Sequence, residues 1–158
     1  MGLKKESFAV ADTVSVLNPY NFGDPDVIRI PFDGTPVNVL TVDVCVKQPQ
    51  GTQVSIDSMA QIVVVGQTEP GEGVTFEVRY EILRNGNIIA TINDEMDYLP
   101  PSAPERYTNF PNFPVVDNSP IVGINTYDLR CTLLSQTGVS LNDLGAASRS
   151  LKATVFEC

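Results

Sequence analysis

The chain has 158 residues, 42% of them hydrophobic and 18% charged, which is the composition of a globular protein of about one domain. Its 19 acidic and 10 basic residues give a net charge of -9, so we expect neither nucleic acid nor a membrane surface among its partners. The absence of histidine excludes a Ser-His-Asp triad or a His-containing zinc site within one chain.

The first 18 residues are predicted to form an N-terminal extension ahead of a single β-domain over residues 19–158. The segment is either the first strand of the domain or a connector arm that adds to a neighbour's sheet. Two lysines stand near its start, but the apolar stretch of a secretion signal does not follow, so we expect no standard signal. The candidate connector residues are evenly spaced, as in a strand with one apolar face: Phe8, Val10, Val14 and Val16.

Turn residues then surround a short predicted strand at 27–30. Residues 37–46 read VNVLTVDVCV, which is apolar on both parities and predicts a strand covered on both faces. Residues 53–65 begin with alternation and end in a continuous apolar run, and they are predicted to form the next strand.

Residues 74–93 predict a β-hairpin. The first half alternates between apolar and polar side chains, which is the period of a half-buried strand. Asn85-Gly86 follows, and this dipeptide favours a tight turn with positive φ at both central positions. The polar positions Glu77, Arg79 and Glu81 are interpreted as a solvated face with charge pairs rather than as catalytic carboxylates.

The stretch 94–120 is predicted to be a proline-rich loop, because proline removes a donor from a strand ladder. Side-chain oxygens cluster at 93–97 and 24–26, but neither segment has the glycine spacing of a calcium loop, so no metal or cofactor is expected. The aromatic side chains of the loop are candidate interface residues, expected to pack on the sheet or against another subunit: Tyr98, Tyr107, Phe110 and Phe113.

Alternation returns over residues 121–134 and 149–156, and one helical turn is predicted at 141–144. No segment sustains a helical period over ten residues. About eight strands with some long connections predict an all-β, antiparallel jelly-roll-like sandwich, with an immunoglobulin-like sandwich as the second choice. The lack of tryptophan argues against a true immunoglobulin domain.

Three cysteines are an odd number, which hints at pairing between chains. Cys45 and Cys131 fall in predicted strands, where they are either small buried side chains or members of a bridge. Cys158 is the last residue and is free to reach another chain. All three are candidates for an intersubunit disulfide, and a bridge between Cys45 and Cys131 is the alternative.

The runs TFEVRYEILRNG (75–86) and RSLKATVF (149–156) resemble segments of jelly-roll subunits from the surface of bacterial spores, including exosporium proteins and endospore appendage fibres. The resemblance implies a structural role without catalytic residues, at the spore surface or outside the cell. In appendage subunits an N-terminal connector is fixed by disulfides. The extension here contains no cysteine, so that mode is not carried over intact.

We therefore expect a non-enzymatic structural subunit whose partners are copies of itself. It would assemble into an extracellular or spore-surface fibre by strand addition and intermolecular disulfides. Two alternatives stay open. One is a TNF-like trimeric tip that binds a receptor or glycan through residues 94–120, and the other is a viral or phage structural protein.

Overall fold

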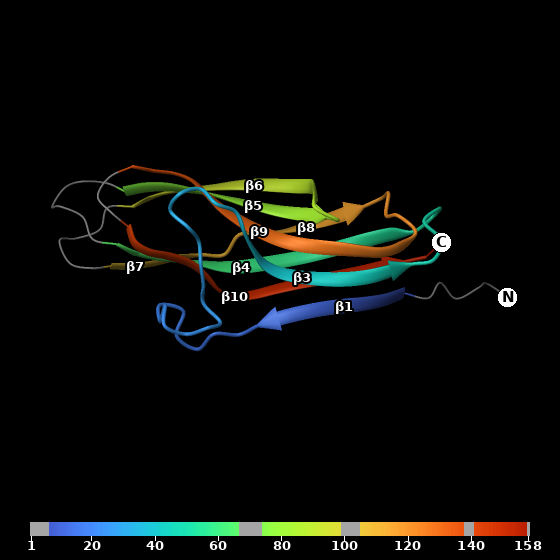
Figure 1. Cartoon of the computed structure of the whole chain (residues 1–158), viewed down its shortest axis with the longest axis horizontal. Coiled ribbons are helices and arrows are strands. Elements are labelled where there is room, and N and C mark those ends of the chain that lie inside the picture. Colours follow the sequence, from blue (N-terminus) through green and yellow to red (C-terminus); the bar gives the residue numbers. More distant parts are fainter. Residues whose placement is uncertain (1–6, 67–73, 99–104, 138–140, 158) are drawn as a thin grey trace.

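The computed structural model describes residues 7–66, 74–98, 105–137 and 141–157 (Figure 1). Within these ranges the chain forms strands and turns, every paired strand runs antiparallel to its neighbour, and no helix long and apolar enough to cross a membrane occurs. The all-β, antiparallel prediction is confirmed. The strands are β1 (Ser7–Val14), β2 (Ile28–Arg29), β3 (Val37–Val46), β4 (Gln53–Gly66), β5 (Val74–Arg84), β6 (Asn87–Tyr98), β7 (Glu105–Asn109), β8 (Asn112–Asp117), β9 (Gly123–Thr137) and β10 (Leu141–Phe156).

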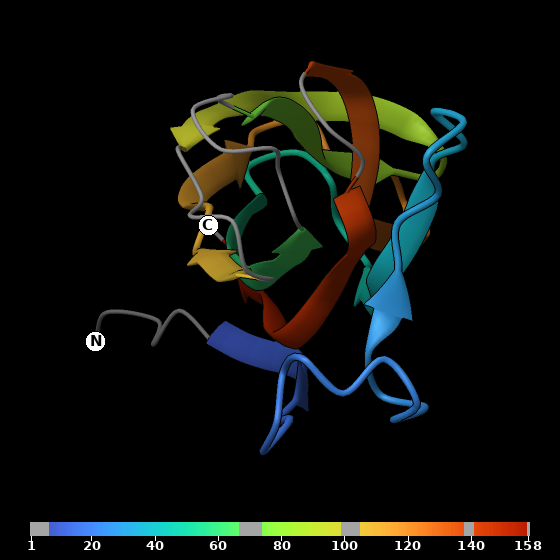
Figure 2. The ribbon, with the colours of Figure 1, turned by 90° about the vertical axis from the view of Figure 1, so that its left-hand side faces the viewer.

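The strands pair in a nested order. The first described strand, β1, pairs with the last, β10; β3 pairs with β9, β4 with β7 and β8, and β5 with β6. One sheet therefore has the order β1-β10-β4, with β7 and β8 along the far side of β4, and the other has the order β3-β9-β5-β6. This arrangement is a jelly roll, and Figure 2 shows its two sheets facing each other.

The core lies between the sheets and is filled by alternate side chains of the long strands. In β3 the outward residues are exposed, so the expectation of cover on both faces is wrong for this strand. A register irregularity between Asn38 and Leu40 changes the inward-facing positions from odd-numbered to even-numbered residues. This explains why apolar residues occupy both odd and even positions of the strand. Val39 and Leu40 are consequently buried in succession.

The hairpin formed by β5 and β6 has the predicted turn. Asn85 has φ of 48° and Gly86 has φ of 80°, so both central residues occupy the left-handed region that the dipeptide favours. The turn is also tied to the neighbouring strand, because the Asn85 backbone amide donates to the Thr126 carbonyl at 2.8 Å. The Thr126 amide in turn donates to Asn85 Oδ1, also at 2.8 Å.

The prediction of a loop over 94–120 is wrong, because this stretch contains the end of β6 and the whole of β7 and β8. Both short strands lie along the same side of β4, at the edge of the sheet. Proline is tolerated at an edge, where one side of the strand makes no ladder hydrogen bonds. Pro114 accordingly lies inside β8, opposite Asp57 of β4.

The predicted helical turn at 141–144 is also wrong, since these residues begin β10. Leu144 pairs with Val64 of β4, and the backbone amide of Ile30 donates to the Leu144 carbonyl at 2.9 Å. The register of β10 against β4 shifts between Ala146 and Arg149. This irregularity interrupts the alternation of apolar and polar side chains, so the first half of the strand could not be recognised from the sequence.

Candidate functional site

The predicted connector segment folds onto its own chain. All eight residues of β1 pair with β10, from Ser7 opposite Phe156 to Val14 opposite Arg149. The four predicted connector residues differ in burial. Phe8 is 41% exposed, Val10 and Val14 pack against the main core, and Val16 is buried in a smaller cluster. The segment is thus the first strand of the domain, and its role as a connector stays a prediction.

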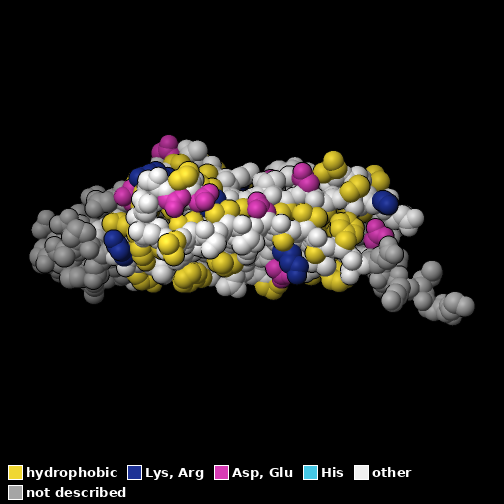
Figure 3. Space-filling model, turned by 90° about the horizontal axis from the view of Figure 1, so that it is seen from below, with side chains coloured by type: hydrophobic (Ala, Val, Ile, Leu, Met, Phe, Trp, Pro, Cys, Tyr) yellow, Lys and Arg dark blue, Asp and Glu magenta, His cyan; other side chains and the backbone are white. Residues whose placement is uncertain are grey.

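The outer edge of β1 is open, since among the described strands β1 pairs with β10 alone. The strand reads SFAVADTV and contains neither proline nor lysine; its one charged residue, Asp12, shares the parity of the core-facing Val10 and Val14. Its side chains on the outer face of the sheet are small and uncharged, whereas the neighbouring β10 carries the exposed Lys152 opposite Ala11. The face of the molecule drawn in Figure 3 carries both acidic and basic side chains among its apolar ones. Such an edge can accept another strand through backbone hydrogen bonds.

The outer face of the second sheet is polar and ordered by contacts across the strands. Thr41 donates to Asp128 at 2.6 Å, and Thr126 donates to Asp43 at 2.6 Å. Glu81 was expected on a solvated face, but it is buried and accepts hydrogen bonds from Arg130 at 2.9 Å. Its carboxylate therefore has a structural partner within the sheet.

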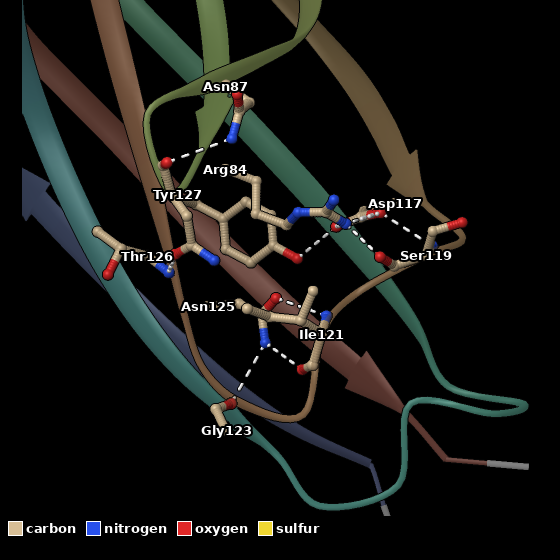
Figure 4. Close-up of polar contacts among 10 residues, drawn as sticks. Arg84, Asn87, Asp117, Ser119, Ile121, Gly123, Asn125, Thr126 and Tyr127 are labelled. Atoms are coloured by element: carbon tan, nitrogen blue, oxygen red, sulfur yellow. Dashed lines mark hydrogen bonds and ion pairs between the residues drawn. The ribbon is translucent and has the colours of Figure 1, made fainter.

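A buried polar cluster lies where β8 ends and β9 begins (Figure 4). Asp117 accepts from Arg84 Nη1 through both carboxylate oxygens, at 3.0 and 2.9 Å, and from the Tyr127 hydroxyl at 2.8 Å. The Ser119 amide adds a fourth hydrogen bond at 2.9 Å, and Arg84 also reaches the Ser119 carbonyl. Burial and the hydrogen bond to Asp117 raise the pKa of Tyr127 far above its usual range, so the hydroxyl stays a donor.

Next to this cluster, Asn125 fixes the turn between β8 and β9 (Figure 4). Its side chain is fully buried; it accepts from the Ile121 amide at 2.9 Å and donates to the Ile121 carbonyl at 2.8 Å. Gly123 has φ of 92°, which lets the chain reverse. The turn leaves Val122 66% exposed and Ile124 64% exposed. Sequence reasoning missed this surface, although Pro120 and Gly123 bracket the apolar residues of the turn.

Arg149 joins the two sheets from within. Its guanidinium donates to three backbone carbonyls: Nε to Val39 at 2.7 Å, and Nη1 to Asp26 at 2.6 Å and to Ala147 at 2.7 Å. These carbonyls belong to β3, to the segment before β2, and to β10 itself. Burial lowers the pKa of Arg149, an effect that the nearby Asp26 and Asp12 oppose.

The described cysteines occupy different environments, and both are free. Cys131 is fully buried between the sheets, opposite Val37 and Tyr80, so it cannot reach a second chain in this fold. Cys45 is exposed and lies opposite Ile124, at the other end of β3. A bridge between Cys45 and Cys131 is therefore excluded by register, because eight residues of extended chain span roughly 26 Å. Cys158 lies outside the described residues.

Of the predicted interface aromatics, two pack between the sheets and one is exposed. Tyr107 contacts Phe76 with ring centroids 6.3 Å apart, and Phe113 contacts Tyr80 at 5.7 Å, so both rings bridge the two sheets. Phe110 is 51% exposed, in the turn between β7 and β8. The side chain of Tyr98 lies outside the described part of the structure.

Of the two acidic segments considered for a metal site, 24–26 precedes β2 and the other is spread along a strand. Residues 93–97 belong to β6, where successive side chains point to opposite faces. Asp94 accepts a hydrogen bond from Asn109 of β7 at 2.5 Å, and Asp97 accepts one from Thr75 at 2.5 Å. In the described ranges, no three acidic or cysteine side chains converge on one point.

No family model and no curated protein matches the chain. A chain in the structure of infectious bursal disease virus strain Gx is similar over 94% of this chain, with a TM-score of 0.52 and 14% identity. A VP2 subviral particle of that virus matches over 94% with a TM-score of 0.48 and 14% identity, and dimeric latent PorU from Porphyromonas gingivalis matches over 98% with 0.42 and 13%. The present chain spans only 32% of each virus chain and 13% of PorU. The match to the Gx strain shows a shared fold, in agreement with the jelly-roll topology.

Proposed function

We propose that this chain is a non-enzymatic structural subunit that assembles with copies of itself into an open-ended fibre. The observation that carries the proposal is the open edge of β1. Alternate residues of this strand direct their backbone donors and acceptors away from β10, and no other described strand pairs with them. A strand from a neighbouring copy would continue the sheet across the boundary between subunits.

The packing of β1 against the core supports a role for its open edge in assembly. Val10 and Val14 pack on the core, which holds the strand in place and spares the partner the entropy of ordering it. Backbone pairing then supplies affinity without demanding a particular side-chain sequence. Contacts of this kind that do not close on themselves generate filaments.

The buried charged groups support the same proposal. Arg149, Glu81 and Asp117 are each engaged by neighbouring groups, and these contacts connect strands and sheets. Removing any of them would leave a buried polar group unsatisfied, so the arrangement favours one rigid packing. A rigid module is what a repeated structural unit requires.

The fold shared with a chain of infectious bursal disease virus supports the second candidate, a viral or phage structural protein. The location proposed for the fibre is the surface of a spore or the outside of a cell. Electron micrographs of the purified protein separate the candidates, since fibres, shells and small oligomers differ in shape.

The test of the fibre proposal is Ala11→Lys, which places a charged side chain on the exposed edge strand without touching the core. The wild-type chain is expected to form extended assemblies, and Ala11→Lys to reduce them to small discrete species. The control is Thr91→Lys in β6, one of the two edge strands of the other sheet; its lysine lies opposite Glu81, whereas that of Ala11→Lys lies opposite Lys152. Extended assemblies that survive Ala11→Lys would exclude the β1 edge, and a wild-type chain that stays monomeric would overturn self-assembly itself.

A further inference from the structure

The turn between β5 and β6 contains a chemically reactive pair of residues. Asn85 is the one asparagine of the chain that is followed directly by glycine. The backbone nitrogen of the next residue can attack an asparagine side chain, and glycine obstructs this attack least because it has no side chain. Asn85 is exposed, and apart from the adjacent residues no heavy atom lies within 4 Å of where a Cβ atom of Gly86 would stand. Solvent therefore has access to the pair.

The reaction converts the Asn85 side-chain amide into a carboxylate. Solvent hydroxide takes the proton from the Gly86 nitrogen, which bonds to Asn85 Cγ, while the bond from Cγ to Nδ2 breaks and ammonia leaves with a proton from water. Water then opens the cyclic imide at either of its carbonyls. Opening between Cγ and the nitrogen gives aspartate. Opening between the main-chain carbonyl carbon and the nitrogen gives isoaspartate, in which the backbone runs through Cγ. The only co-reactant consumed is water.

In the folded chain, β9 holds Asn85 at two of its atoms. The Asn85 amide donates to the Thr126 carbonyl, and Asn85 Oδ1 accepts from the Thr126 amide, both at 2.8 Å. The carboxamide is thus turned toward its own N–H and toward β9, whereas the imide ring closes on the other side of the residue, at the Gly86 nitrogen. Ring closure therefore requires the side chain to rotate and to give up the hydrogen bond from Thr126.

The two products have different effects on the turn. Aspartate at this position keeps an oxygen that accepts from the Thr126 amide, and Asp-Gly favours the same turn conformation as Asn-Gly. Isoaspartate inserts a methylene group into the backbone of the turn. Arg84 and Asn87, which pair directly across the turn, cannot then keep their register. Isoaspartate is consequently expected to separate the turn from β9.

We propose that Asn85-Gly86 is a deamidation site whose reaction is controlled by the contact with Thr126. The reaction proceeds only in copies whose turn has opened from β9, so the accumulated product records how often that contact opens. Copies that contain isoaspartate do not regain the closed turn, which makes the change irreversible. This inference is independent of self-assembly and assigns a chemical modification site to the hairpin.

The first experiment compares the folded chain with the chain unfolded in urea, in one alkaline buffer, and follows Asn85 by mass spectrometry of proteolytic peptides. Hydrogen exchange of the Thr126 amide supplies the scale, because it measures how rarely the contact opens. The fold is expected to slow deamidation by the same factor as it slows exchange of this amide, within about threefold. A larger difference in either direction would overturn control by this contact.

The second experiment removes the donor. Thr126→Pro lacks the backbone N–H and is expected to raise deamidation of Asn85 in the folded chain by about tenfold or more. Thr126→Val keeps the N–H and is the matched control, since both variants lose the hydroxyl that donates to Asp43. Equal rates in the two folded variants would overturn the proposal. The comparison with hydrogen exchange in the wild type stands even if Thr126→Pro does not fold.

The third experiment tests the consequence for the turn. Asn85→Asp is expected to keep the wild-type protection of the Thr126 amide, whereas chains purified with isoaspartate at this position are expected to lose it. Equal protection in the two would overturn the irreversible opening. Gly86→Ala, compared with the wild type in urea, is expected to slow deamidation because its Cβ atom obstructs the attacking nitrogen. An unchanged rate in urea would exclude the imide route.

Discussion

The Tyr127 hydroxyl donates a 2.8 Å hydrogen bond to Oδ2 of Asp117, the oxygen that Arg84 also contacts at 2.9 Å. Three elements meet in this carboxylate, because Arg84 ends β5, Asp117 ends β8 and Tyr127 belongs to β9. The interaction therefore fixes the end of the sandwich at which the turn between β8 and β9 exposes Val122. It links the core to this turn.

Asp117→Ala is expected to lower the free energy of unfolding by about 3 kcal/mol, because the buried Tyr127 hydroxyl loses its acceptor and Arg84 loses its ion pair. Tyr127→Phe removes one hydrogen bond and leaves the ion pair, so about 1 kcal/mol is expected. Urea denaturation followed by circular dichroism measures both. Equal losses in the two variants would contradict the view that Asp117 is the centre of the cluster.

Arg149→Met is expected to lower the free energy of unfolding by about 3–5 kcal/mol. The buried carbonyls of Val39 and Ala147 and the part-buried carbonyl of Asp26 would lose their donor, and the methionine side chain cannot replace the hydrogen bonds. Lys152→Met, at an exposed position of the same strand, is the control and should change the stability by less than about 0.5 kcal/mol. Similar values for both variants in urea denaturation would show that the three carbonyls find other donors.

Gly145→Ala is expected to displace β2 from β10. A Cβ atom at this position would lie 2.9 Å from the Ile28 carbonyl oxygen and 2.8 Å from a ring carbon of Phe22, so backbone must move. A loss of about 1–3 kcal/mol follows from overpacking of this kind. Limited proteolysis should then cleave near residues 22–30 faster than in the wild type. Unchanged cleavage and unchanged stability would mean that β2 can shift at little cost.

The protein is expected to lose stability above about pH 9. Burial raises the pKa of the Cys131 thiol from 9.0 to about 12, and burial also raises the pKa values of Tyr80 and Tyr127. A group whose folded pKa is raised stabilises the fold fully below its unfolded pKa. That contribution is lost as the pH rises toward the folded pKa, by up to about 1.4 kcal/mol per pH unit for one group.

Urea midpoints measured between pH 8 and 11 check this expectation, and Cys131→Ala should flatten part of the slope. A thiol reagent at pH 8 provides an independent measurement. Cys45 is expected to react at once, and Cys131 only in urea. Rapid reaction of Cys131 in the native protein would show that the core opens far more readily than its packing indicates.

Two local features could be predicted from the sequence. The strand at 37–46 has the predicted bounds, although its register shifts between Asn38 and Leu40, and the turn at Asn85-Gly86 has the predicted conformation. The period failed where the register shifts, as between Ala146 and Arg149, and where prolines lie in an edge strand, as at Pro114. Both errors arise because the cost of a local irregularity depends on the neighbouring strand, which one sequence does not identify.

The candidate surfaces were less accessible to prediction than the strands. Alternation indicated that Phe8, Val10 and Val14 form a strand, but the choice between their own sheet and a neighbour's depends on the distant β10. The exposure of Val122 depends on the Asn125 side chain holding the turn. Contacts over long sequence separations decided each of these points.

The nested pairing has a consequence for how the chain folds. β10 is the central strand between β1 and β4, so neither of its neighbours can complete its pairing until the last described strand is available. Local hairpin formation can complete only the β5–β6 pair early, and the rest requires closure of long loops, which slows folding to the range of milliseconds to seconds. During synthesis, the edges of β1 and β4 that pair with β10 would remain unpaired until β10 has been synthesised. The open edges of these strands are therefore most exposed to incorrect pairing in the interval before β10 is available.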